Sequence, residues 1–390
     1  MASRELTGRQ RMLAAYSCRQ GDHVAVCPDL SNMVPVRLSG RPFDQMYLDG
    51  LPHEGYTSAS VAGAYVEAVK YFGFDGMYIY GSLPEIVPEE KPRWNEEVRR
   101  HPDGGKTTQS SLQTRHGVLS RATRYFPDEP PWDTEKPVKD LQRDWPRLRS
   151  LMGEPETWKW QNDFSNRNAI GERGVYAFIL PLPQDWWFAQ RDGGYNNLFF
   201  DYVDNGPYMQ EVMEFYSAYG VAKARAGLAA RPDEIWLGGS ASSLSVSSLE
   251  YFRLFDLPFI KAVSALCKQA GVVSHVHVCG KSARAAELMA EESDVNVIEP
   301  LEGSPGGDVD IAAFKRRYGH RVCIKGNLNT YDFMLHATPS QVEAESKRLI
   351  DECAGGGGFV LSTGDQCGRD TPDANIFKLV EVAQTYGCYR

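Results

Sequence analysis

VVSHVHVCG, residues 272–280, has the composition of a short buried β-strand, and RVCIKGNLN (321–329) and GFVLSTG (358–364) repeat the pattern. Each run is apolar, ends in glycine or asparagine, and precedes a segment with the periodicity of an amphipathic helix. Apolar strands that alternate with helices are typical of parallel strands buried on both faces. These runs therefore predict a parallel α/β sheet.

Five further runs extend the pattern along the whole chain. They are HVAVCPDL (23–30), GMYIYGS (76–82), GVYAFILPLP (174–183), DEIWLGGSAS (233–242) and VNVIEPLEG (295–303). Eight strand and helix units predict a (β/α)8 TIM barrel, with a doubly wound α/β sheet as the alternative. We expect residues 1–390 to form one such domain.

The long connection between the second and third predicted strands, residues 84–173, predicts an insertion. A connection of this length is usually disordered or a functional lid. Its five tryptophans indicate order, because disordered segments contain few aromatic residues. We expect a β-hairpin formed by GVLSRATRYF (117–126) and PPWDTEKPVK (130–139), and we expect the insertion to cover the barrel mouth.

The composition of the chain indicates which classes of partner it binds and where in the cell it is expected. A formal net charge of −9 argues against nucleic acid or an anionic membrane as a partner. The chain has no apolar run long enough to cross a bilayer, its opening residues lack a signal-peptide core, and its eight cysteines show no disulfide spacing. We expect a cytoplasmic protein that acts on a small molecule or another protein, and a homodimer remains an option.

His277, Cys279 and Cys367 are the candidate metal ligands. Each follows or ends a predicted strand, so the three side chains are expected to meet at one end of the sheet. One imidazole and two thiolates suit Zn²⁺, and three protein ligands leave a position open for substrate. The alternative is that both cysteines are small buried side chains and that His277 is a hydrogen-bonded core residue.

Aromatic and polar residues near two strand ends are candidates for a substrate pocket. Tyr80 follows the second strand, and Gln184, Asp185, Trp186 and Trp187 follow the third. The cluster suits an aryl methyl ether or a corrinoid, and Asp185 is a candidate catalytic residue among them. The alternative for each aromatic residue is packing of the insertion against the barrel.

Polar residues after the sixth and seventh strands complete the candidate site. Glu299 and Glu302 are candidates for acid–base catalysis or for a fourth zinc ligand. Asn327 is a candidate for binding substrate or orienting a metal ligand. A salt bridge or a helix cap is the alternative role for either glutamate.

Several segments resemble the uroporphyrinogen decarboxylase superfamily, which includes zinc methyltransferases that act with corrinoid proteins and coenzyme M. The similar segments are LTGRQRMLAAYSCRQGDHVAV (6–26), GGSASSLSVSSLEYFRLFDLPFIK (238–261), IKGNLNT (324–330), ATPSQVEAESKRLIDECAGGGGFVLSTG (337–364) and TPDANIFKLVEVAQTYG (371–387).

The resemblance favours the methyltransferase branch. That branch has His-x-Cys-Gly after the fifth strand and Cys-Gly after the eighth, which match His277, Cys279 and Cys367 with their following glycines. Residues 28–50 lack the arginine-rich run of the decarboxylases. One departure concerns the third ligand, since residues 364–366 separate the last strand from Cys367.

The resemblance implies a zinc-dependent methyltransferase that moves a methyl group between a small molecule and a cobalamin carried by a partner corrinoid protein. Since the chain lacks a corrinoid-binding signature, the cobalamin must come with the partner. A methoxylated aromatic is the expected methyl donor, in an O-demethylation. The alternatives are a metal-free decarboxylase of the uroporphyrinogen type and a non-catalytic corrinoid-binding or chaperone protein.

Overall fold

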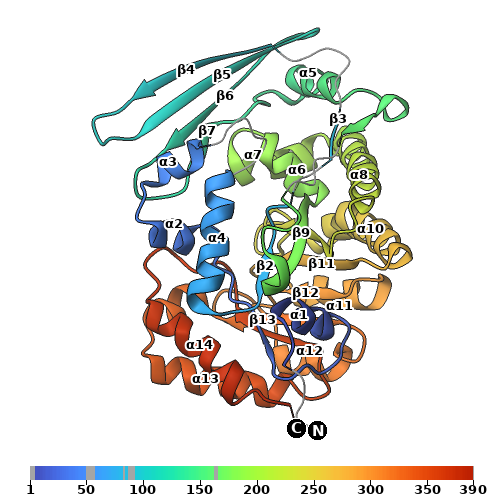
Figure 1. Ribbon diagram of the computed structural model, residues 1–390. Helices are drawn as coiled ribbons and strands as arrows, with labels where there is room; N and C mark the ends of the chain where they lie inside the picture. Colours follow the sequence, from blue (N-terminus) through green and yellow to red (C-terminus); the bar gives the residue numbers. More distant parts are fainter. Residues whose placement is uncertain (1–4, 50–57, 82–83, 87–92, 162–165, 390) are drawn as a thin grey trace.

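Eight parallel strands form one curled sheet in the computed structural model, which describes residues 5–49, 58–81, 84–86, 93–161 and 166–389 (Figure 1). All eight predicted strands are present. In sheet order they are β1 (Ala25–Val26), β14 (Phe359–Thr363), β13 (Cys323–Leu328), β12 (Val297–Glu299), β11 (Val273–Val278), β10 (Glu234–Gly239), β9 (Gly174–Pro181) and β2 (Gly76–Tyr78).

The two edge strands of the sheet, β1 and β2, approach each other without forming a ladder in the described residues. The backbone nitrogen of Asp75, just before β2, donates to the carbonyl oxygen of Val26 at 2.8 Å. Val26 returns a hydrogen bond to the Asp75 carboxylate at 3.0 Å. This contact joins the two edges of the curled sheet at one point. The sheet therefore approaches the predicted barrel, but no ladder of strand hydrogen bonds closes it in the described residues.

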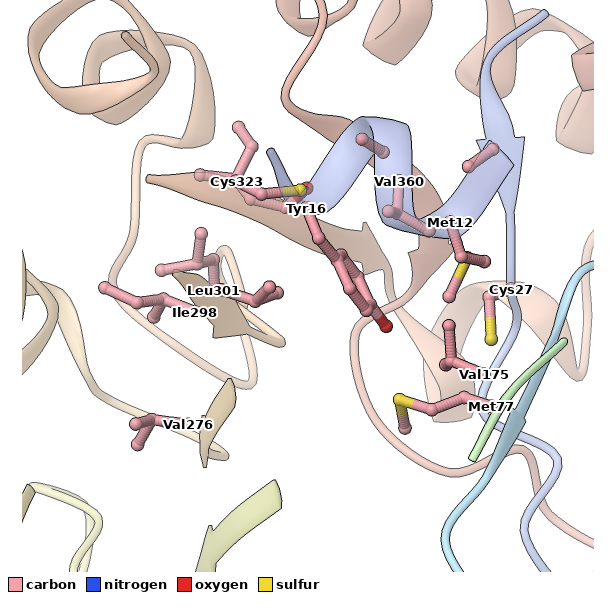
Figure 2. Close-up of a cluster of buried hydrophobic side chains, with 14 of the residues drawn as sticks. Met12, Tyr16, Cys27, Met77, Val175, Val276, Ile298, Leu301, Cys323 and Val360 are labelled. Atoms are coloured by element: carbon pink, nitrogen blue, oxygen red, sulfur yellow. The ribbon is translucent and has the colours of Figure 1, made fainter. Parts of the chain in front are cut away.

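Helix α1 (Gly8–Tyr16) covers the amino-terminal end of the strands. Its Arg11 bonds both Asp22 and Asp75, at 2.7 and 2.5 Å, and these three side chains are almost fully buried. Met12 and Tyr16 of the same helix lie in a cluster of buried side chains with strand residues such as Cys27 (Figure 2). Because α1 fills this end, a site open to solvent must lie at the carboxyl ends of the strands.

Helices surround the sheet between successive strands, as the sequence periodicity predicts. None of the described helices is both long and apolar enough to span a bilayer. Beside α1, the main helices are α2 (Met33–Ser39), α3 (Phe43–Leu48), α4 (Ala59–Phe72), α6 (Pro183–Gln190), α7 (Gly194–Asp204), α8 (Gly206–Leu228), α10 (Leu257–Ala270), α11 (Ala283–Glu292), α12 (Ile311–Tyr318), α13 (Pro339–Cys353) and α14 (Asp373–Thr385).

An antiparallel sheet and helix α5 (Leu141–Met152) make up most of the insertion. β6 (Gly117–Tyr125) and β7 (Trp132–Glu135) pair as the predicted hairpin, and β4 (Arg93–Arg100) and β5 (Lys106–Thr114) extend it to four strands. A two-stranded pair joins β3 (Glu85–Ile86) to β8 (Trp160–Gln161). Residues 87–92 and 162–165 of the predicted insertion lie outside the described residues.

The insertion contacts the rest of the protein on two sides. On one side the Lys106 ammonium pairs with Asp44 of α3 at 2.6 Å, and the backbone nitrogen of Phe43 donates to Pro127. On the other side Trp145 of α5 packs edge-to-face on Trp187 of α6. The insertion therefore spans from α3 to α6.

A glycine inside α8 allows close helix packing around α6. A Cβ atom at Gly220 would lie 2.5 Å from the Trp186 ring and 2.7 Å from the Phe259 ring. Trp186 also stacks on Tyr216. The absence of a side chain at position 220 therefore permits this aromatic packing.

We expect Gly220→Ala to lower the free energy of unfolding by about 1–3 kcal/mol, because both rings must move away. Gly63→Ala is the matched control: Gly63 lies exposed within α4, with no atom within 4 Å of the added Cβ. That change should raise stability by about 0.5–1 kcal/mol, since alanine is the better helix former. Urea unfolding measures both, and equal effects of the two substitutions would contradict the packing described here.

Candidate functional site

His277 and Cys279 lie together at the carboxyl end of β11. His277 pairs in register with Glu299 of β12, and its Nδ1 atom lies 3.1 Å from Glu299 Oε1. The Cys279 side chain is half-buried and within hydrogen-bonding reach of the His277 ring. The structure therefore brings two of the three predicted metal ligands side by side.

Glu299 lies behind His277, at the centre of a buried polar network. Its carboxylate accepts hydrogen bonds from Lys325 Nζ and, at 2.6 Å, from Trp236 Nε1. His275 Nε2 lies 3.4 Å from the same carboxylate. Burial disfavours the charged form, but the Lys325 charge and the two histidines outweigh it and hold the pKa of Glu299 well below its usual range. Glu299 is thus a fixed anion that orients His277.

The second ring nitrogen of His277 points toward the loop after β14. Its Nε2 atom lies 4.0 Å from Asp365 Oδ1, and the Asp365 side chain is 40% exposed. Burial lowers the pKa of His277, but contacts with Cys279 and Glu299 and the charge of Asp365 raise it well above the ordinary value. Asp365 is therefore part of the site.

Glu302 lies on the loop after β12, beside the same group. Its carboxylate accepts a hydrogen bond from the backbone nitrogen of Gly280, next to Cys279. Burial and the nearby Asp365 carboxylate raise the pKa of Glu302. Glu302 therefore lies beside His277 and Cys279, next to the strand that carries this pair, where the sequence predicted it.

Asp185 holds the loop after β10 against the site. Its carboxylate accepts hydrogen bonds from the backbone nitrogens of Ser240 and Ala241, at 2.7 and 2.8 Å, and from the Ser242 hydroxyl. Burial raises the pKa of Asp185 to about 6. Since the Cys279 thiol lies 3.6 Å from the Ser240 hydroxyl, Asp185 anchors one wall of the site.

Cys367 does not join the other two predicted ligands in the described structure. It is fully buried, its backbone nitrogen donates to the Asp29 carbonyl, and its thiol lies beside the hydroxyls of Thr363 and Thr371. Burial raises the pKa of the Cys367 thiol to about 12. Among the residues placed by the structure, no three His, Cys, Asp or Glu side chains are gathered at metal-binding distances.

The side chains predicted to bind substrate after β9 belong mainly to the protein core. Trp187 is fully buried and donates from Nε1 to Asp201 at 3.1 Å. Gln184 is also fully buried, bonded to Asp256 and Ser247. These two side chains are therefore closed off from solvent, and Trp186 is half-buried against Tyr216 and Phe259.

Tyr80 and Asn327 are the remaining residues predicted to bind substrate, and each is bonded to a backbone carbonyl. Tyr80 is buried, and its hydroxyl donates to the carbonyl of Ser31. Asn327 donates to the carbonyl of Leu301 at 2.6 Å. Asn327 also borders a surface hollow of about 460 Å³ between the loops after β12 and β13 and the helices α12 and α13. Among the predicted site residues, Asn327 is the one that lines this hollow.

Sequence reasoning named Glu299 but missed His275 and Lys325, which hold its carboxylate, and Asp365 on the other side of His277. His275 precedes it by two residues, so both rings face the same side of β11. The spacing of His275 and His277 indicates that both rings belong to one site. Lys325 inside an apolar strand is a second indication, because a buried cation requires a buried anion as its partner. Asp365 was harder to identify from the sequence, because Cys367 lies two residues away and a cysteine is the more specific metal ligand.

We expect Lys325→Met to lower the free energy of unfolding by about 3–5 kcal/mol, because it leaves the Glu299 carboxylate buried without its strongest cation. The control is Lys261→Met, which removes an exposed ion pair with Glu292 and should cost under about 1 kcal/mol. Urea unfolding of both variants measures the difference. Similar losses would show that the Lys325–Glu299 pair is not a stabilising contact.

The cysteines should differ in reactivity with iodoacetamide at pH 8. Cys388 is exposed and should react readily, whereas Cys367 should remain unmodified because its thiol is buried and its pKa is raised. Peptide mass spectrometry of the native protein measures both sites, and labelling in urea provides the reference. Native Cys367 reacting as fast as Cys388 would contradict the placement of its thiol.

The chain is similar to known proteins of one family. Residues 192–386, half of the chain, match the family model "Uroporphyrinogen decarboxylase (URO-D)". A methylcobamide:CoM methyltransferase, MtbA, of Methanosarcina mazei is 27% identical over 213 residues, 55% of this chain and 56% of that protein. A uroporphyrinogen decarboxylase of Chlorobaculum tepidum is 28% identical over 180 residues, 45% of this chain and 47% of the relative. The chain thus spans about half the length of the curated relatives it matches.

A solved structure shows the same fold over the whole chain. It is a methyltransferase from Methanosarcina mazei, with a TM-score of 0.62 and 16% sequence identity, and the match covers 98% of this chain and 99% of that one. The family match includes β10 to β14 and every residue of the candidate site that follows α7. The chain belongs to the uroporphyrinogen decarboxylase family.

Proposed function

We propose that the protein is a methyltransferase that moves a methyl group between a small molecule and a cobamide carried by a separate corrinoid protein. One observation carries this proposal: a thiol and an imidazole, Cys279 and His277, lie together at the carboxyl end of the sheet in a chain similar to MtbA. Barrel enzymes of this kind build their active sites at that end.

The residues around this pair supply proton transfer and orientation. A methyl group that leaves an oxygen requires a proton on that oxygen, and one that reaches a thiol releases a proton. The carboxylates of Asp365 and Glu302 flank His277 and are placed to exchange such protons. Glu299 fixes the imidazole ring, and Asp185 fixes the loop beside Cys279.

An aromatic pair next to Cys279 supports a methoxylated aromatic as the small molecule. Tyr195 lies near Asp185 and Cys279, and its ring stacks on Phe188 with centroids 4.4 Å apart. Both rings are half-buried. Because Lys136 Nζ lies 3.8 Å from the centroid of the Phe188 ring, Tyr195 is the ring of this pair that we propose to stack on a planar substrate, the part that the sequence suggested for Trp186 and Trp187.

The zinc site formed by His277, Cys279 and Cys367 remains a prediction. Two of the three side chains fit a metal, but the buried thiol of Cys367 does not fit without a change in its loop. We therefore assign no step of the reaction to zinc.

We propose further that residues 84–173 cover the site and contribute to corrinoid-protein docking. The insertion contacts α3 on one side and α6 on the other, so it bridges elements that follow β1 and β9 (Figure 1). A cover that excludes water protects reactive intermediates.

A decarboxylase that holds substrate carboxylates is the weaker alternative. Such a site needs free arginines after the first strand, and residues 28–50 contain only Arg37 and Arg41. Arg37 pairs with Asp373 of α14, and Arg41 pairs with Asp49 at 3.0 Å. Both guanidinium groups are therefore already engaged.

The test is a spectroscopic assay of cobalt methylation. We expect the protein to change the absorption of methylcobalamin in the presence of a thiol, or of cob(I)alamin in the presence of a methoxylated aromatic. His277→Ala and Cys279→Ala should lower that rate at least about 100-fold while the circular dichroism spectrum is unchanged. The proposal fails if no thiol, methylamine or methoxylated aromatic changes the cobalt spectrum while uroporphyrinogen is decarboxylated.

A further inference from the structure

We propose that strand β4 of the insertion pairs with β4 of a second copy of this chain, so that two four-stranded sheets join into one antiparallel sheet. The strand has the sequence RWNEEVRR, and it forms one edge of the insertion sheet, with β5 as its neighbour. Figure 1 shows it as the outermost strand, on the side of the insertion away from the eight-stranded sheet. This inference goes beyond the proposed methyl transfer and does not depend on it.

The first argument is that β4 is a long, regular and exposed edge strand. It pairs with β5 along all 8 of its residues without a register shift, and residues 94–100 are all exposed. The strand at the opposite edge, β7, has 4 residues and a register shift in its pairing with β6. A long, regular edge presents a row of unpaired backbone groups to another strand. Of the two edges of this sheet, β4 is therefore the one suited to pairing.

The second argument is the direction of the free backbone groups. The backbone nitrogen of His101 donates to the carbonyl of Gly105 at 2.9 Å, in continuation of the β4–β5 pairing. His101 and every second residue before it therefore turn their amide and carbonyl groups toward β5. The groups that point to the outer edge belong to the residues in between, which are Trp94, Glu96, Val98 and Arg100. An antiparallel second strand must therefore pair its own even-numbered residues with these.

The third argument is the charge pattern, which is complementary to itself in one of these registers. When Val98 lies opposite Val98 of the second copy, Glu97 lies opposite Arg99. In the same register Glu96 lies opposite Arg100. Because two copies pair with two-fold symmetry, each of these pairs occurs twice, and every one joins opposite charges. The next allowed register in either direction places Glu97 opposite Glu97, or Arg99 opposite Arg99, and like charges repel.

The fourth argument is that these charges are unused within one copy. Among the residues that the structure places, no ion pair or side-chain hydrogen bond involves the four charged side chains next to Val98, which are Glu96, Glu97, Arg99 and Arg100. On the neighbouring strands, by contrast, Arg124 pairs with Asp103 and Lys106 pairs with Asp44. Val98 itself is 57% exposed. An exposed apolar residue between unused charges of both signs suits a second copy of the same strand.

The size of this contact indicates a weak, reversible dimer. Within the strand, the three outward-facing pairs form about six backbone hydrogen bonds, two for each pair. A contact of one strand on each side is small for a stable interface, so we expect a dissociation constant on the order of 10 μM. The pairing uses no residue of the candidate site.

Sedimentation velocity of the full chain, between about 1 and 200 μM, tests the inference. We expect a reversible equilibrium between monomer and dimer. The double substitution Glu96→Arg with Glu97→Arg makes all four charged positions positive, and Arg99→Glu with Arg100→Glu makes them negative. Each variant alone should weaken the dimer at least about tenfold, because four attractive pairs become repulsive.

Two matched controls keep the same charges. An equimolar mixture of the positive and negative variants should associate again, because each cross-strand pair then joins opposite charges. The fourfold substitution that exchanges the glutamates and arginines within one chain should restore the homodimer. Circular dichroism checks that every variant is folded, which we expect since all four positions are exposed.

A disulfide tests the register. The Cα atoms of residue 98 in the two copies should lie about 5.5 Å apart, within the range of a disulfide. Val98→Cys should therefore give a covalent dimer with glutathione disulfide. The control is Asn95→Cys, at an exposed position of the same strand, where the two thiols should lie about 20 Å apart and form no such dimer.

Three results would overturn the inference. The first is a wild-type chain that stays monomeric over the whole concentration range. The second is a dimer that persists in both like-charge variants, which would show that the copies meet through another face. The third is a failure of the mixed variants to associate, or covalent dimers of Asn95→Cys in place of Val98→Cys, which would exclude the proposed register.

Discussion

The hydrogen bond between Glu299 and His277 determines how the site is built. Glu299 sits on the short strand β12 and is held as an anion by Lys325 of β13, while Trp236 of β10 donates to the same carboxylate. One carboxylate therefore connects four adjacent strands of the parallel sheet. Because Lys325, Trp236 and His277 approach it from different strands, the imidazole has one orientation, with Nε2 toward the open end.

The two ends of the sheet carry different kinds of side chain. Helix α1 and its Arg11 close the amino-terminal end with buried ion pairs and apolar side chains. The carboxyl ends carry loops that present a thiol, an imidazole and several carboxylates. The amino-terminal end is thus filled by packed side chains, and the proposed site lies at the other end, where barrels of parallel strands usually build their active sites.

The sequence predicted the sheet well because its strands are continuous apolar runs, from β1 to β14. The sequence did not predict β4 and β5, because the residues of these strands are mostly polar. The inward face of β5 carries Thr108 and Ser110 as well as Leu112, so no apolar alternation marks this strand. His277 and Cys279 were found because strand and motif coincide. Trp187 and Gln184 were expected at the mouth, but α6 turns them into the core, and such a turn depends on packing against α7 and α8. The path of the loop from Gly364 to Cys367 likewise depends on contacts with β1.

Glu299 holds the Nδ1 atom of His277, so the Nε2 atom faces the open end of the sheet on the side of Asp365. Anomalous diffraction at the zinc edge, from crystals grown with Zn²⁺, tests this most directly. We expect one strong peak at about 2.0–2.1 Å from His277 Nε2 and about 2.3 Å from Cys279 Sγ, with the Glu299 contact to Nδ1 intact. A peak bonded to Nδ1, or a His277 ring turned away from Glu299, would contradict it.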